Sequence, residues 1–506
     1  MFKMIFKKLF VFRPLYLLVF LLSLYGLGAS PISILPFFNL PLIFLLVRIN
    51  SITNNLWLFV SLAIGTGFSY SEQGAPSDSY FANVWVLTIV GAAVALLTLL
   101  PMIITKYLIK FIKRNQFFND KILNSDENNS YTTSQFYLFL FPVLWTITWS
   151  MFRRYIPLGS WGDWAYTINN SGYGGDPIMQ ITSIGGLSAV NIILALMAQI
   201  TTDYFIYYHM KNKFEVQQLE NNNNNSNENH LIDLISEEGE EETPFLQNNQ
   251  NNQDNQNNNK INKMKIKAEQ LSIQNWYLRF GLIILLLVII IFGSHRLYYL
   301  EDSNLENIGK LTVGCVLPPP GSNIEKMMKL TDALATQHNS KIILWAESAV
   351  DLRDDDELEL LMTRAKKLAN KKKFYLGLTY TISEGGSARF KKKNMLTLIG
   401  PNNETVFDYQ KTHPVPIAEY STESGPGGNL RVENIEIFNK ISKDSISINV
   451  SGAICLDMDF PELLTTASEA DIVLQPAQTW SSIIGLQHLK MASTRAIENG
   501  KNDEID

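Results

Sequence analysis

A cysteine near the end of the chain has the residue type and the position that nucleophilic catalysis needs. Cys455 follows the apolar, β-type run 446–454, and three acidic residues lie within the next seven positions: Asp457, Asp459 and Glu462. A thiol at the end of a buried strand can act as a nucleophile because a rigid scaffold holds it in one place. At neutral pH an unperturbed thiol, with a pKa of about 8.5, is mostly protonated and needs a base or a nearby cation. Free cysteine is also among the most buried residue types, so the chemical interpretation depends on finding these partners.

Two upstream segments carry the groups that such a thiol needs. Glu347 ends an apolar, strand-like run, and the proline-containing segment 408–420 carries both Lys411 and Glu419. Glu347 can accept the thiol proton, and the Lys411 ammonium can donate to the oxyanion that forms when Cys455 attacks a carbonyl. Each residue also has a structural explanation, as a cap, a solvated lysine or a core cysteine. The site hypothesis therefore requires that the fold bring all of them together.

In chain order, the Glu, Lys and Cys motifs resemble those of the nitrilase superfamily, and most closely its membrane-bound branch, apolipoprotein N-acyltransferase. That branch has W-P-E-S, K-x-H-x-V-P-F-G-E-Y and C-Y-E-x-x-F-P-E, where this chain has W-A-E-S from residue 345, K-T-H-P-V-P-I-A-E-Y from residue 411 and C-L-D-M-D-F-P-E from residue 455. The resemblance implies a catalytic triad of Glu347, Lys411 and Cys455. It also implies Glu419 and Asp457 as auxiliary groups, and the family has a Glu where this chain has Asp457.

Long apolar runs dominate the first 300 residues of the chain. A bilayer core of about 30 Å requires about 20 apolar residues in a helix. Seven runs approach this length, which predicts seven spans, give or take one or two: 9–27, 32–47, 56–68, 84–108, 136–152, 184–207 and 278–292. The first run alone is also compatible with a cleaved signal peptide, and buried helices of a large soluble protein are a second alternative. So many uncharged runs favour an integral, multi-pass membrane protein.

Charged and aromatic residues around the runs predict how the chain lies in the membrane. Lys and Arg cluster before the first run, after the second and fourth, and before the seventh, which places these segments in the cytoplasm by the positive-inside rule. The region after residue 292 then faces a lumen or the exterior, although Arg153 and Arg154 break the pattern. The sequon at Asn403 would then be a glycosylation acceptor. We assign four tryptophans to an interfacial belt: Trp145, Trp149, Trp161 and Trp164.

Composition divides the chain into four parts. Residues 1–210 form a membrane domain with about six helices, and residues 276–300 a further transmembrane helix. Between them, residues 211–275 contain Asn and Gln tracts and an acidic block, a composition typical of a disordered linker. Residues 308–506 alternate predicted strands and helices, which indicates an α/β domain with buried sheets.

The α/β pattern predicts individual elements. Strands are expected at 311–317, 342–345, 374–381, 446–454 and 472–475, a hairpin at 394–399 and 405–409, and helices at 323–338, 357–369, 461–468 and 483–499. Cys315, on the first strand, is expected to be a core residue. The superfamily resemblance implies a four-layer αββα sandwich. Because relatives continue beyond residue 500 with a further strand, we expect this sandwich to be incomplete at its C-terminal end.

Three functions are compatible with these features. The membrane-branch resemblance favours an integral-membrane N-acyltransferase that takes an acyl chain from a phospholipid, holds it as a Cys455 thioester and passes it to an amine or lipoprotein-like acceptor. A membrane-tethered amidase or nitrilase-type hydrolase uses the same triad with water as acceptor, and a non-catalytic relative is the third possibility. A net charge of −6 gives no reason to expect a nucleic-acid partner. His413 lacks partners at metal-ligand spacing, and we expect neither a metal nor a cofactor.

Overall fold

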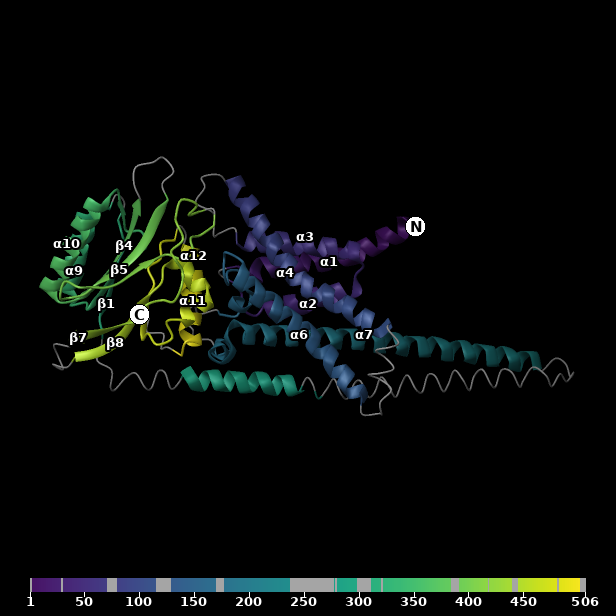
Figure 1. Cartoon of the computed structure of the whole chain (residues 1–506). Coiled ribbons are helices and arrows are strands. Elements are labelled where there is room, and N and C mark those ends of the chain that lie inside the picture. The colour runs from purple at the N-terminus through teal and green to yellow at the C-terminus, as the bar shows by residue number, and fades with distance from the viewer. Residues whose placement is uncertain are drawn as a thin grey trace.

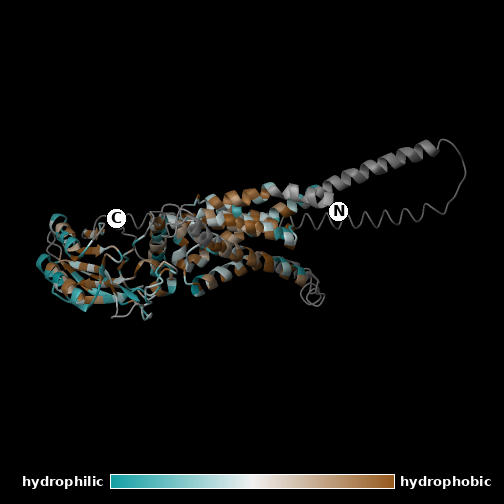
Figure 2. Ribbon diagram, turned by 90° about the horizontal axis from the view of Figure 1, so that it is seen from above, coloured by the Kyte–Doolittle hydropathy of each residue, from teal (hydrophilic) through white to brown (hydrophobic). Residues whose placement is uncertain are grey.

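The structure has a helical N-terminal part and a C-terminal α/β part (Figure 1). It is a computed structural model, and hydropathy differs between the parts: the helices of the first are mostly apolar, and the outer helices of the second are largely hydrophilic (Figure 2). The structure describes residues 2–28, 31–70, 80–114, 129–169, 177–236, 277, 280–297, 311–319, 322–383, 391–416, 418–438, 445–479 and 482–500.

The N-terminal part consists of long helices that pack side by side: α1 (Phe2–Gly26), α2 (Pro36–Ile49), α3 (Ile52–Ser69), α4 (Tyr80–Arg114), α6 (Asn129–Tyr155) and α7 (Thr182–Ser236). A further helix spans Phe280–Leu297. Each of the seven predicted apolar runs overlaps one of these helices. Three described segments are long and apolar enough to cross a bilayer: Thr88–Ile112, Met179–His209 and Phe280–Leu297. The chain is therefore interpreted as a membrane protein, and the count of seven spans stays a prediction.

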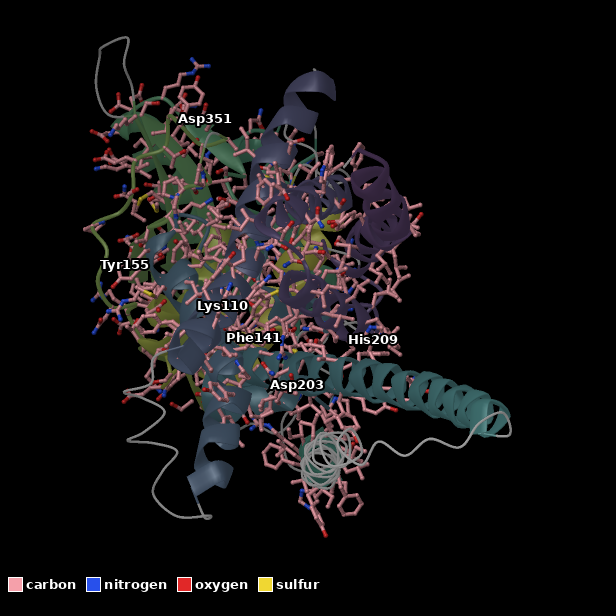
Figure 3. All side chains as sticks on the ribbon, turned by 90° about the vertical axis from the view of Figure 1, so that its right-hand side faces the viewer. Lys110, Phe141, Tyr155, Asp203, His209 and Asp351 are labelled. Carbon is pink, nitrogen blue, oxygen red and sulfur yellow. The ribbon has the colours of Figure 1, made fainter. Side chains whose placement is uncertain are left out.

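The predicted tryptophan belt is wrong for three of its four members. Trp145, Trp149 and Trp164 are fully buried in the core of the helical part. Trp145 donates its indole N–H to Asn191 at 3.1 Å, so a polar partner inside the bundle replaces the interfacial water that the prediction assumed. Phe44 of α2 stacks on Phe141 of α6 in the same core, with ring centroids 4.1 Å apart. Figure 3 labels Phe141.

Helix α7 runs further than the sequence predicts. It continues through Ser236, so the disorder expected from residue 211 is wrong for the first 26 of those residues, 211–236. Residues 211–220 are mostly Lys, Glu, Gln and Leu, which are good helix formers. Extending an existing helix requires no new nucleus, so such residues prolong it readily. The remainder of the predicted linker, from residue 237 to 275, lies outside the described residues.

The α/β part contains two sheets. The larger has strand order β1-β2-β4-β5-β6 with β3 paired to β4, and the smaller has the order β7-β8-β9. The strands are β1 (Val313–Val316), β2 (Ile342–Trp345), β3 (Val350–Leu352), β4 (Tyr375–Ser383), β5 (Lys392–Ile399), β6 (Thr405–Gln410), β7 (Glu433–Phe438), β8 (Ser445–Gly452) and β9 (Ile472–Leu474). Strands β3 and β7 were not predicted. β3 is only three residues long, which is too short to show a clear periodicity.

Four layers result from three separate hydrophobic cores, as the superfamily resemblance implies. Helices α9 (Ile324–Gln337) and α10 (Asp355–Lys372) pack on the outer face of the larger sheet. A second core joins the two sheets, and a third joins the smaller sheet to α11 (Pro461–Thr465) and α12 (Ser482–Glu498). The predicted αββα sandwich is therefore confirmed. The chain segment on which we based the expected C-terminal incompleteness, residues 501–506, lies outside the described residues.

The prediction that Cys315 is a core residue is wrong, because its side chain is exposed. It lies on β1, the edge strand of the larger sheet, on the same face as Val313, which is 50% exposed. The three strands of the smaller sheet do not cover this face at the edge. An apolar strand sequence indicates burial only where another layer lies over it.

The two parts meet at helix α12. Gly159, in the loop after α6, approaches a short 3₁₀ turn, η4 (Cys455–Asp459), and the N–H of Ser160 donates to the carbonyl oxygen of Asp459 at 2.8 Å. On α12 itself, Glu498 accepts from the N–H of Leu187 in α7 at 3.0 Å. The turn that begins with Cys455 is thus packed directly against the helical part.

Gly159 allows this close approach, and its replacement tests the interface. It has φ +57°, and a Cβ there would lie 2.5 Å from the carbonyl oxygen of Asp459. We expect Gly159→Ala to cost about 1–2 kcal/mol for the left-handed backbone and about 1–3 kcal/mol more for overpacking. Gly427→Ala is the matched control, because Gly427 has φ +70° and open space around its Cβ. Thermal unfolding of the full-length protein in detergent measures both losses, and equal losses would contradict a tight contact at Gly159.

Topology gives a second prediction. Asn403 is exposed, with φ +70°, in the turn between β5 and β6, whereas the other sequon of this domain, at Asn449, lies within β8. If the α/β part faces a lumen, we expect a glycan on Asn403 and none on Asn449. The oligosaccharyltransferase of the host needs a flexible, accessible acceptor, and a residue within a strand is not one. An endoglycosidase mobility shift, lost in Asn403→Gln and retained in Asn449→Gln, would show this. Full digestion of the domain by a protease added to the cytosolic face of sealed vesicles would refute the orientation.

Candidate active site

A buried lysine lies between two carboxylates at the centre of the candidate site. Lys411 follows β6 directly, and its backbone N–H bonds the carbonyl of Asn394, which extends the pairing with β5. Its Nζ lies 2.7 Å from Oε1 of Glu347 and 2.6 Å from Oε2 of Glu419. The lysine is fully buried, and Glu347 is 4% exposed. Burial alone would lower the pKa of Lys411, but Glu347, the neighbouring thiol and Glu419 outweigh burial and raise it, so the ammonium stays charged.

Glu347 is held in the turn between β2 and β3 by three donors. Its Oε1 accepts from Lys411 and from Nδ2 of Asn394 at 2.9 Å, and its Oε2 accepts from the N–H of Gln478 at 3.0 Å. Asn394 also approaches Glu419, at 3.5 Å. Sequence analysis did not identify Asn394 as a site residue. Its position two residues after the start of a strand offered no signal, since a buried Asn on β5 becomes meaningful only beside the two carboxylates.

Cys455 lies next to this cluster, at the start of η4. Its backbone has φ +49°, a left-handed conformation that is uncommon outside glycine and often occurs at functional sites. Its N–H bonds the carbonyl of Pro476 at 3.0 Å, which anchors the turn to the segment after β9. Burial raises the pKa of the thiol well above its usual range, Glu347 raises it further and Lys411 opposes the shift. The resting thiol is therefore protonated and needs a base to become a nucleophile.

Asp457 does not join the ion cluster; instead it organises the turn behind Cys455. Its Oδ2 accepts from the hydroxyl of Tyr409 at 2.8 Å and from the N–H of Ile454 at 3.1 Å. Its Oδ1 lies 2.8 Å from the backbone N and 3.0 Å from Nδ1 of His413, whose ring stacks on Phe460 with centroids 3.5 Å apart. Asp457 thus ties the lysine loop to the cysteine turn.

One residue near the thiol was missed altogether by sequence analysis. His488 of α12 places Nε2 3.6 Å from Sγ of Cys455, and its side chain is buried. It lies 33 residues after the cysteine in a segment that reads as an ordinary amphipathic helix. The helix period puts one face toward the core but does not reveal which core residue that face meets.

The predicted site residues therefore form two adjoining groups. Glu347, Lys411 and Glu419 make one buried ion cluster, and Cys455 and Asp457 belong to the neighbouring turn. Among the described residues there is no cluster of three or more His, Cys, Asp or Glu that fits a metal ion. The arrangement can do covalent acyl chemistry, because a thiol, a carboxylate and a fixed ammonium adjoin one another.

Comparison with known proteins supports this chemistry at the family level. Residues 316–501 match the carbon-nitrogen hydrolase family. The apolipoprotein N-acyltransferases of Rickettsia prowazekii and Rickettsia typhi are each 24% identical over 179 residues, which cover 31% of this chain and 34% of each relative. The chain thus spans about a third of the length of these curated relatives.

Several solved structures of amidases have segments similar to part of this chain. An amidase from Nesterenkonia sp. aligns with 39% of this chain and 76% of its own at 17% identity, with a TM-score of 0.30. An N-terminal amidase aligns with 33% of this chain and 47% of its own at 18% identity, with a TM-score of 0.27. These likenesses are too distant to bear on substrate. Residues 316–501 therefore match a carbon-nitrogen hydrolase domain, and part of the chain is similar to the apolipoprotein N-acyltransferases, which supports a place in the nitrilase superfamily.

Proposed function

We propose that the protein is an integral-membrane N-acyltransferase that moves an acyl chain from a phospholipid to an amine through a thioester on Cys455. The observation that carries this proposal is the buried Lys411, paired with Glu347 and Glu419, beside a thiol whose turn packs on the helical part. The names of the curated relatives favour a lipoprotein-like acceptor. In this proposal the catalytic domain faces a lumen or the exterior.

Glu347 serves as the base in the acylation half-reaction. Its Oε1 accepts two hydrogen bonds and its Oε2 accepts that of Gln478, and a side-chain hydrogen bond between Cys455 and Glu347 positions this carboxylate to take the thiol proton. The sulfur bonds the ester carbonyl carbon, and the Lys411 ammonium stabilises the resulting oxyanion. Collapse breaks the ester C–O bond, and Glu347 returns the proton to the departing alkoxide. A lysophospholipid leaves and the acyl chain stays on Cys455.

The transfer half-reaction needs a base for the incoming amine, and Glu419 suits that role. Its Oε2 is occupied by Lys411 and by the N–H of Val415, both at 2.6 Å, whereas within the described part of the chain Oε1 has only the 3.5 Å contact from Asn394. Glu419 is also more exposed than Glu347, with 22% against 5% side-chain exposure, so an acceptor can reach it more easily. The amine nitrogen bonds the thioester carbonyl carbon, its proton passes to Glu419, and the C–S bond breaks. The departing Cys455 thiolate then regains a proton while Glu419 loses the one it took, which restores the resting thiol.

A hydrolase is the alternative, because the same residues work with water as acceptor. The contact between the cysteine turn and the helical part favours the transferase, since it brings the nucleophile next to the part that holds apolar, lipid-like surface. A non-catalytic relative is disfavoured by the strained backbone of Cys455, which packing alone does not require.

The covalent intermediate gives the decisive experiment. Full-length protein in detergent, incubated with phospholipid, is expected to carry an acyl mass on the Cys455 peptide that hydroxylamine removes, and Cys455→Ala is expected to carry none. A transferase keeps the adduct until an amine is added, whereas a hydrolase loses it to water. If folded wild-type protein never becomes labelled by lipid or amide substrates, both enzyme proposals are wrong.

The ion cluster predicts two substitutions that block adduct formation. Glu347→Gln keeps the shape but cannot take a proton, and Lys411→Arg places a planar fork where a buried ammonium fits between two carboxylates. Each is expected to slow labelling on the order of 10²–10³-fold, as loss of one oxyanion donor does. Glu436→Gln and Lys329→Arg, on exposed surface, are the controls for each change of residue type. Labelling at the wild-type rate in Glu347→Gln would exclude Glu347 as the base.

Glu419→Gln separates the two half-reactions. If Glu419 acts on the acceptor, this variant is expected to form the adduct at a rate near wild type and to transfer it to an amine at least roughly 10²-fold more slowly, within the range of general-base contributions. Single-turnover chase of a preloaded adduct with an amine measures the second step alone. A chase rate equal to wild type would show that another group deprotonates the amine.

A further inference from the structure

The thiol of Cys455 has a second neighbour that the triad chemistry does not use. Nε2 of His488 lies 3.6 Å from its Sγ, within hydrogen-bond distance for sulfur. The ring is 6% exposed and is also met edge-on by Trp161 of the helical part, with centroids 5.8 Å apart and planes at 72°. The imidazole is thus fixed between the nucleophile and the loop after α6 that carries Trp161.

The free nitrogen of the ring indicates which tautomer is present. Among the described residues Nδ1 of His488 is buried with no hydrogen-bond partner. A neutral imidazole has one N–H and one acceptor nitrogen, and a buried N–H without a partner is the rarer and costlier of the two. The proton therefore belongs on Nε2, where it points to sulfur, and Nδ1 remains an acceptor.

The imidazole also stays neutral. Burial lowers the pKa of His488 to about 4, and this is opposed by Glu347 and reinforced by Lys411. The charged groups that face the His488–Cys455 pair are Glu347, in the turn between β2 and β3, and Lys411 and Glu419, in the loop after β6. A ring that remains neutral at physiological pH is not a proton carrier but can be a fixed hydrogen-bond donor.

The charge of the ion cluster shows why such a donor matters. Lys411 is the cation nearest the thiol, but it is already shared by two carboxylates at 2.7 and 2.6 Å. In the resting cluster two carboxylates and one ammonium carry an excess of negative charge, which opposes ionisation of the thiol. When Glu347 takes the thiol proton, Lys411 is still paired with Glu419, so a donor aimed at the sulfur itself adds stabilisation that the shared lysine does not supply.

We propose that His488 donates its Nε2–H to the sulfur of Cys455 and stabilises the thiolate, both as nucleophile and as leaving group. The histidine keeps its own proton throughout: the thiol proton goes to Glu347 before attack, and the thiolate regains the Nε2–H hydrogen bond when the thioester breaks. Its place in the cycle rests on the proposed acyl-transfer function. The hydrogen bond itself does not, because it exists in the resting enzyme.

The rate of Cys455 alkylation as a function of pH tests this proposal. Iodoacetamide reacts with the thiolate, and the chain has only one other cysteine, the exposed Cys315, so Cys315→Ser provides the background. In full-length protein in detergent, His488→Leu is expected to raise the apparent pKa of alkylation by roughly one to two pH units, the value of one hydrogen bond to a charged group. His488→Gln keeps an N–H donor near the ε position and is expected to stay close to wild type.

Two further variants complete the test. His488→Asn keeps a polar side chain that is too short to reach the sulfur. Its apparent pKa of alkylation is expected to rise as in His488→Leu, and it takes the place of that variant if the leucine variant does not fold. His338→Gln, at the exposed end of α9, is the control for loss of a remote histidine. A thermal melt establishes that each variant is folded.

The outcomes separate the two proposals. An unchanged alkylation profile in folded His488→Leu or His488→Asn overturns the role of His488, as does an equal shift in His488→Gln, which would assign the effect to ring packing. If the alkylation pKa shifts in the His488 variants but wild-type protein never forms an acyl adduct, the hydrogen bond is supported and the proposed function is refuted. If wild-type protein forms the adduct but the alkylation pKa does not shift in the variants, the proposed function is supported and the role of His488 is refuted.

Discussion

The ion pairs of buried Lys411 are the interaction on which the rest of the site depends. Removing an ammonium from water costs several kcal/mol, and only two carboxylates at 2.7 and 2.6 Å, together with their own hydrogen bonds, offset that cost. Breaking such a pair costs about 3–5 kcal/mol, because it leaves an uncompensated buried charge. The loops that carry Glu347 and Glu419 are therefore held at fixed distances from each other, and this fixed frame is what orients groups around the thiol.

A second constraint fixes the cysteine turn from the opposite side. Asp459, at the end of η4, is fully buried, and burial raises the pKa of its carboxyl well above the usual range while Arg495 opposes the shift. Arg495 donates to the hydroxyl of Tyr166 in the helical part at 2.9 Å and pairs with Glu498 at 2.7 Å. The nucleophile therefore lies between a polar network that belongs to the sandwich and a second network that is shared with the helical part.

Local sequence patterns predicted most of the sandwich but not the relations between its layers. Strands β2, β6 and β8 could be predicted to within two residues at their ends because strand periodicity and flanking turn residues are local, and the motif order then gave Glu347, Lys411 and Cys455 as the candidate triad. Burial of Cys315 was predicted wrongly because it depends on how far a second sheet extends. The tryptophans of the bundle were placed at the membrane interface because Asn191, the partner of one indole, lies on a different helix.

His488 shows the limit of such prediction most clearly. Nothing within α12 distinguishes this histidine from a packed core residue, since its two neighbours, Cys455 and Trp161, come from the sandwich and from the helical part. Its chemical environment exists only when both parts are assembled around it. The loop that carries Trp161 also forms a hydrogen bond with the cysteine turn, between Ser160 and Asp459. A displacement of the helical part would therefore change the positions of the imidazole and the thiol together. Docking of the two parts is therefore a condition for the geometry of the thiol and not merely a means of tethering the domain to a bilayer.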